Sequence, residues 1–178
     1  MDHGSKWQSD VRNYWKWRVN KDIVNSCIKR VSLLKQDSKP ELSEEMVKNV
    51  EIKLNIFFPE DFKILCNFYG YDFFRLFDFY NFRREEGVIE ETKYYREKHN
   101  LPSNYLVLFS DDVSFVLLKI ISTDKSEVIW CDYQDFFKLC EGHPMQYNPT
   151  IFPSFVDFYE YLLDEEEKIR AEDQLLDD

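Results

Sequence analysis

The chain of 178 residues predicts a single α+β domain with N-terminal helices, a mainly antiparallel sheet and a packed C-terminal helix. Three observations predict this fold. Apolar residues recur at helical spacing in the first third, short apolar runs separated by turn residues follow residue 100, and a capped amphipathic segment comes near the end. With 4 Trp, 11 Tyr and 16 Phe against 4 Gly and 6 Pro, the composition favours a folded globule over disorder.

Four helices are expected before residue 100. Apolar residues spaced by four, then three, predict one long helix over residues 11–34, or two broken near Asn20. Ser43 is the expected cap of a second helix, and Pro59 suits the first position of a third, which Gly70 would end. Residues 85–99 read as a fourth helix with a charged, solvated face. The expected inner faces are Val47, Val50 and Leu54 in the second helix, and Phe62, Leu65, Cys66 and Tyr69 in the third.

The sheet is expected mainly after residue 100. Strands are predicted at residues 105–109, 115–121 and 127–131, with turns at 111–112 and 122–126. The aromatic run 71–84 is interpreted as a further strand because of its alternation after Phe77. Ser154 and Asp157 have the spacing of a capping box for the last helix, and the acids from Asp164 onward are expected to form a charged, frayed tail.

Charge and hydropathy limit the partners and the location. The net charge is −11, with +5 on residues 1–40, −8 on residues 41–156 and −8 on residues 157–178. Such a chain repels nucleic acid and attracts basic protein surfaces. No apolar run is long enough to cross a bilayer and no apolar signal region is seen, so we expect a cytoplasmic protein that binds neither nucleic acid nor membrane. Cys27, Cys66, Cys131 and Cys140 have apolar neighbours and are expected to be buried free thiols.

The search for catalytic chemistry is negative. Cys140 and His143 have the spacing of half a zinc site, but a second half is missing. Glycine-rich phosphate loops and nucleophile elbows are absent from the sequence. We therefore expect no catalytic residue, cofactor or metal. A hydrolase that uses clustered carboxylates is the alternative, because sequence cannot show whether acids converge.

Four segments, in order, carry a family resemblance. They are residues 43–62, with Leu54-Asn55-Ile56-Phe57-Phe58-Pro59-Glu60-Asp61-Phe62; Leu101-Pro102 before the first strand; Glu127-Val128-Ile129-Trp130-Cys131-Asp132; and Ser154-Phe155-x-x-Phe158 with Leu162-Leu163. Over about residues 22–167 the chain resembles the SUKH superfamily, in the branch of the yeast cell-wall-synthesis regulator and its bacterial relatives. It departs at residues 68–71, where the family often has N-G-G, and at residues 111–114, where its hairpin often has glycines.

The resemblance implies a non-enzymatic binder. Bacterial members are mostly immunity proteins, so the implied function is to neutralise a cognate toxin domain, of nuclease type, by covering its basic active site. The alternative implied by eukaryotic relatives is a cytoplasmic regulatory or scaffolding module, with the Trp-rich N-terminal helix as its dock. The motif residues Pro59, Phe62, Trp130, Phe155 and Phe158 are expected in the core. The implied organisation is an N-terminal extension at 1–21, the domain at 22–167 and an acidic tail at 168–178, in a monomer or weak homodimer.

The partner-binding site is predicted where acids and a tyrosine follow the ends of strands. Loops held by a rigid sheet often carry function, and tyrosine beside acids offers an apolar anchor with a polar tip. These residues are Asp111, Asp112, Glu127, Asp132, Tyr133 and Asp135. The acids of residues 164–167 are a second choice.

Overall fold

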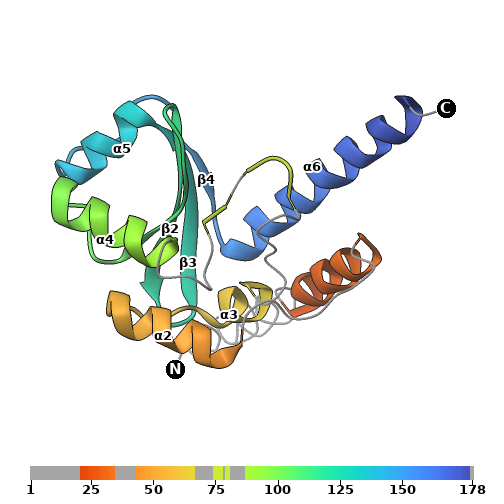
Figure 1. The fold of residues 1–178 in the computed structure, drawn as a ribbon, viewed down its shortest axis with the longest axis horizontal. Coiled ribbons are helices and arrows are strands. Elements are labelled where there is room, and N and C mark those ends of the chain that lie inside the picture. Colours follow the sequence, from red (N-terminus) through yellow and green to blue (C-terminus); the bar gives the residue numbers. More distant parts are fainter. Residues whose placement is uncertain (1–20, 35–42, 67–73, 78, 81–86, 177–178) are drawn as a thin grey trace, which may run out of the picture.

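The sheet divides the molecule into two layers. The computed structural model describes residues 21–34, 43–66, 74–77, 79–80 and 87–176. Four strands form an antiparallel sheet in sequential order, β1 (Tyr105–Ser110), β2 (Ser114–Ser122), β3 (Lys125–Asp132) and β4 (Thr150–Phe152). Helices α4 (Val88–His99) and α5 (Tyr133–Cys140) lie on one side of the sheet, and α6 (Phe155–Leu176) lies on the other (Figure 1). The predicted α+β class is confirmed.

The remaining helices pack at the base of the sheet and along α6. They are residues 21–34, α2 (Glu44–Leu54) and α3 (Glu60–Cys66). Ser43 caps α2, since its hydroxyl accepts the Met46 N–H, and the buried face of α2 is the predicted one, Val47, Val50 and Leu54. Phe62, Leu65 and Cys66 are buried in α3 as expected. Residues 1–20, Tyr69 and Gly70, on which some of these expectations fall, lie outside the described residues.

Two apolar cores lie on opposite faces of the sheet because successive strand residues point to opposite sides. Leu106 and Leu108 of β1 belong to the core under α6, whereas Tyr105 and Val107 belong to the core under α4 and α5. The first core also holds Phe62, Phe155 and Phe158, with Trp130 partly buried against it, and Pro59 is buried. All four cysteines are free and buried, as predicted.

The structure corrects three expectations. Residues 74–77 and 79–80 of the aromatic run form no strand, although the Tyr80 N–H donates to the Leu108 carbonyl (2.8 Å). Their rings fill the core instead. Helix α5 and strand β4 were not predicted. The expected frayed tail is wrong for residues 164–176, because α6 continues as a regular helix to Leu176.

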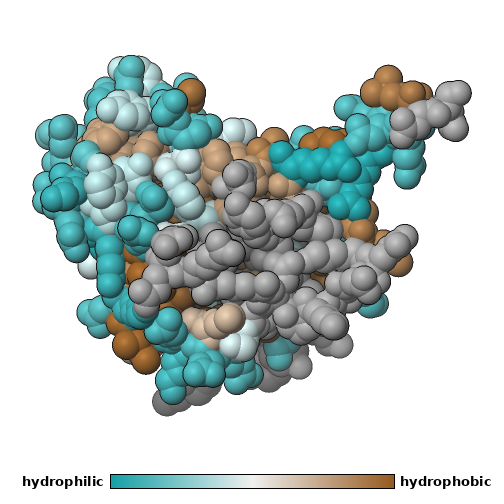
Figure 2. Space-filling model, in the orientation of Figure 1, coloured by the Kyte–Doolittle hydropathy of each residue, from teal (hydrophilic) through white to brown (hydrophobic). Residues whose placement is uncertain are grey.

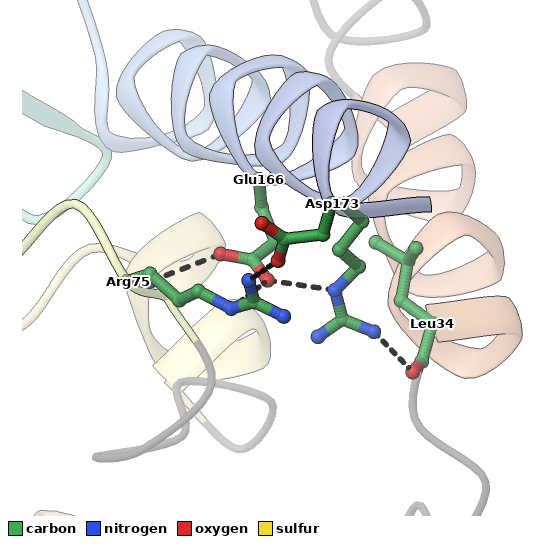
Figure 3. Close-up of polar contacts among 5 residues, drawn as sticks. Leu34, Arg75, Glu166 and Asp173 are labelled. Carbon is green, nitrogen blue, oxygen red and sulfur yellow. Dashed lines mark hydrogen bonds and ion pairs between the residues drawn. The ribbon is translucent and has the colours of Figure 1, made fainter. Parts of the chain in front are cut away.

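Glu166 holds the outer half of α6 against the rest of the molecule. Its side chain is 1 % exposed. One carboxylate oxygen accepts the Arg75 backbone N–H (3.0 Å), and the other accepts the Nε–H of Arg170 (2.7 Å). A second nitrogen of Arg170, Nη1, donates to the Leu34 carbonyl (2.8 Å). Asp173 pairs with the Arg75 guanidinium (Figure 3). We call Glu166, Arg75 and Arg170 the Glu166 network. It joins α6, the end of helical residues 21–34 and the segment at Arg75.

Candidate functional site

The turn between β1 and β2 presents two acids to solvent. One carboxylate oxygen of Asp111 accepts the backbone N–H of Val113 (2.8 Å) and of Ser114 (2.6 Å). These hydrogen bonds favour the charged form, and the pKa of Asp111 is lowered by them. Asp112 and Val113 beside it are exposed. The turn is therefore held by its own hydrogen bonds around an ionised Asp111, and residues 111–114 contain no glycine.

Asp132 and Tyr133 meet this turn from the end of β3. Asp132 is opposite Ser114 in the sheet register, and the Tyr133 N–H donates to the Val113 carbonyl (2.9 Å). The Asp132 carboxylate caps α5 by accepting the Asp135 N–H (2.8 Å). The Tyr133 side chain is 52 % exposed. Four predicted residues, Asp111, Asp112, Asp132 and Tyr133, are thus together at one end of the sheet.

The other two predicted residues are not part of this group. Glu127 is five residues from Asp132 along β3, about 16 Å away at the usual strand rise, and it pairs with Nζ of Lys119 (3.1 Å). Asp135 is fully buried, so its expected exposure is wrong. Its carboxylate accepts the backbone N–H groups of Gln146 (2.5 Å) and Tyr147 (2.8 Å). Asp135 thereby fixes the loop between α5 and β4.

Beside the turn, the predicted Asp111 lies with hydroxyls and a second acid that sequence reasoning missed. We call Tyr80, Glu91, Tyr95, Ser110 and Asp111 the tyrosine–acid cluster. The Tyr80 hydroxyl is 2.6 Å from the Ser110 hydroxyl oxygen, where β1 ends. Tyr95 and Glu91 come from the same face of α4, four residues apart, and Tyr95 packs on Phe115 of β2 (5.3 Å between centroids). The spacing of Glu91 and Tyr95 was the available signal, but that face was interpreted as merely solvated.

The electrostatics of the cluster disfavour more negative charge. Burial raises the pKa of the Tyr80 hydroxyl, and the neighbouring Glu91 and Asp111 carboxylates raise it further. Burial likewise raises the pKa of Tyr95, with Glu91 adding to the effect. The pKa of Glu91 itself is raised by burial and by Glu90. Burial is thus the largest cause of each of these three pKa shifts, and neighbouring carboxylates add to it.

A row of aromatic rings runs from α4 to α5 next to this cluster. We call Tyr94, His99, Phe137 and Tyr133 the aromatic row. Successive ring centroids are 5.7 Å, 4.9 Å and 4.5 Å apart. The terminal members, Tyr94 and Tyr133, are about half exposed. Figure 2 shows that the surface over α4 and α5 is mostly hydrophilic with paler residues set among the polar ones.

The groups on this surface are suited to contact with positively charged groups. Carboxylates accept hydrogen bonds, phenol hydroxyls accept and donate them, and ring faces attract cations. Within the described ranges, no three His, Cys, Asp or Glu side chains come together as a metal site. Burial raises the pKa of the Cys140 thiol to about 11, while His143 is exposed in the next loop. The described helices include none that is long and apolar enough to cross a membrane.

The architecture and the surface define an α+β domain with helices on both faces of an antiparallel sheet and an acidic, aromatic end. The chain belongs to the SUKH_5 family, described as SMI1-KNR4 cell-wall, whose model matches residues 21–142. This family includes polymorphic-toxin immunity proteins, and its immunity and regulatory members are generally non-catalytic. The match contains the whole tyrosine–acid cluster and α5 and ends before α6. A search of curated proteins found no match.

Proposed function

We propose that this chain is an immunity protein that binds the C-terminal domain of a cognate toxin and covers its basic active site. Membership of a family that includes such proteins carries the proposal. The net charge of −11 agrees with it, because a site that holds phosphate must be basic and an acidic protein can imitate its substrate. Nuclease toxins are the expected class for this reason.

The surface best suited to the contact is the end of the sheet with Asp111, Asp112 and Tyr133. Its carboxylates are exposed and set on a hydrogen-bonded turn, so little conformational freedom is lost when a partner binds. Tyr133 supplies apolar area with a polar tip, the kind of residue that often dominates binding energy.

The test is a growth assay in which the C-terminal domain encoded by the neighbouring gene is expressed with and without this chain. We expect toxicity in its absence, rescue in its presence, and a 1:1 complex on co-purification. A toxic domain that still kills cells containing abundant, folded protein would contradict the proposal.

A cytoplasmic regulatory or scaffolding module is the second candidate, favoured by the cell-wall description of the family. Residues 1–20, with Trp7, Trp15 and Trp17, lie outside the family match and would be its dock. Deleting residues 1–20 separates the candidates: loss of partner binding by a chain that still folds supports the module, whereas retained rescue of growth supports immunity.

A further inference from the structure

The two acids of the tyrosine–acid cluster have no cation paired with them among the described residues. Some acids elsewhere are paired, namely Glu51 with Lys63, Glu127 with Lys119, and Asp164 and Glu167 with Arg30, whereas the exposed Glu97 and Glu172 have no such pair among the described residues. Across the part of the chain that the structure describes, neither Glu91 nor Asp111 has an ammonium or guanidinium nitrogen within 4.0 Å. Glu91 is moreover only partly exposed, so water alone screens it incompletely.

The oxygen atoms of the cluster match a planar, multi-donor cation. Glu91 has two carboxylate oxygens, and the Tyr80 and Ser110 hydroxyls, joined to each other at 2.6 Å, keep lone pairs for a further donor. Asp111 uses one oxygen for the hydrogen bonds of the turn, and its other oxygen takes no part in them. A guanidinium has five N–H donors in a fixed fork, whereas an ammonium is a compact point charge.

The rings beside the cluster favour the same ligand. Tyr94 and Tyr133, at the two ends of the aromatic row, expose about half of their surface. Arginine stacks on such faces and is less strongly hydrated than lysine, so it loses less on leaving water. Hydroxyls, uncompensated acids and exposed rings thus converge on one chemistry.

We propose that the tyrosine–acid cluster, with Tyr94 and Tyr133 at its margin, is the subsite that receives an arginine side chain from the partner's basic surface. The proposal rests on the proposed function for the identity of the partner as a toxin domain. It goes beyond it by naming the residues that read the partner and the side chain that they read. Binding at this subsite would pair the guanidinium with the carboxylates of Glu91 and Asp111, while the neutral hydroxyls of Tyr80 and Ser110 accept its hydrogen bonds.

The test needs no toxin, because hexa-arginine peptide serves as the probe and hexa-citrulline as its neutral match. ¹⁵N-labelled protein is titrated with each peptide and followed by NMR. We expect arginine-dependent shifts centred on Glu91, Tyr95 and residues 110–114, and no comparable shifts with citrulline. Shifts spread evenly over the acidic surface would overturn the proposal.

Matched charge variants make the test specific. Glu91→Gln with Asp111→Asn removes two charges, and the Asn keeps an oxygen for the Val113 and Ser114 N–H groups. Glu97→Gln with Glu172→Gln removes two charges from exposed sites elsewhere. We expect roughly tenfold weaker peptide binding in the first variant and less than twofold in the second. Equal weakening in both would overturn the proposal.

A second variant keeps the test independent of those acids. Tyr133→Ser removes an exposed ring and should weaken peptide binding about threefold, with the folded NMR spectrum retained. Unchanged affinity would remove the ring from the subsite. The growth assay reads out the proposed function separately. Rescue of growth without binding of the arginine peptide would contradict only the arginine subsite. Binding of the arginine peptide without rescue of growth would contradict only the proposed immunity function.

Discussion

The Glu166 network and the tyrosine–acid cluster are two acidic regions with opposite surroundings. Glu166 is buried, and both of its oxygens are occupied by Arg170 and by the Arg75 backbone, which lie on separate segments. Glu91 and Asp111 are more exposed and have hydroxyls and rings around them without a paired cation among the described residues. The comparison teaches that charge count alone does not locate a binding site. An acid whose two oxygens are both occupied inside the chain stabilises the fold, whereas a more exposed acid without a paired cation is available to a partner.

The largest expected effect is the loss of the Glu166 carboxylate. Glu166→Ala removes the acceptor of the Arg75 N–H and the carboxylate that accepts from Nε of Arg170, so the free energy of unfolding should fall by about 3 kcal/mol. Urea unfolding measures it, with Glu172→Ala as the exposed control on the same helix, expected within about 0.5 kcal/mol of wild type. A loss below about 1 kcal/mol for Glu166→Ala would show that this acid contributes little to the fold and would contradict its contrast with Glu91 and Asp111.

A smaller difference in stability is expected between Asp132, which caps α5, and Asp135, which lies in its first turn. Asp135→Ala removes the hydrogen-bond acceptor of the Gln146 and Tyr147 N–H groups, so we expect a loss of about 2 kcal/mol in unfolding free energy. Asp132→Ala removes only a helix cap, at a cost of about 1 kcal/mol. The same urea experiment ranks them. The reverse order would mean that Asp135 belongs with the acids that are free for a partner.

The dependence of stability on alkaline pH tests the burial of the Cys66 thiol. Burial raises the pKa of the Cys66 thiol to about 12, against an ordinary value of 9.0. The pKa of this thiol is higher in the folded state than in the unfolded state. The stability that the buried neutral thiol contributes is therefore fully present below pH 9 and is lost as pH rises from 9 toward 12. The unfolding free energy of wild type should therefore fall more steeply than that of Cys66→Ala, by up to about 1.4 kcal/mol per pH unit. Parallel slopes between pH 8 and pH 10.5 would show that this thiol titrates alike in both states.

The smallest expected effect is on the stability of the cluster variants. Glu91→Gln with Asp111→Asn leaves an oxygen that can accept the Val113 and Ser114 N–H groups of the turn, so the unfolding free energy should change by less than about 0.5 kcal/mol. Thermal and urea unfolding check this together. A loss above about 2 kcal/mol would show that these acids stabilise the fold after all.

The sequence predicted the parts of the fold that depend on local patterns. The strands at 105–110, 114–122 and 125–132 alternate between two apolar cores and are bounded by turn residues, so period and turn chemistry sufficed. Ser43 and Ser154 were recognisable as caps because capping needs only nearby N–H groups. Helix α5 had a similar signal, Asp132 followed by Asp135, Phe136 and Cys140, which was interpreted as an exposed strand end instead.

The candidate site was only partly predictable because burial and pairing are tertiary properties. Asp111, Asp112, Asp132 and Tyr133 follow strand ends that a hairpin sheet brings together. Asp135 is buried by the loop at 146–147, eleven residues onward, and that contact has no local signature. Tyr80 reaches Ser110 only because the segment at residues 79–80 packs on β1, and Glu91 lies near Tyr80 only because α4 packs on the same strand.

The most direct test of the central claim is the dissociation constant of the neighbouring gene's C-terminal domain with wild type, with Glu91→Gln/Asp111→Asn and with Glu97→Gln/Glu172→Gln, each at low and physiological salt. Since the cluster acids lie beside hydroxyls and exposed rings that can hold a cation with them, we predict at least tenfold weaker binding and a weaker salt dependence for the first variant, and less than a twofold change for the second. Wild-type affinity in the cluster variant, or equal weakening in both, would contradict the account.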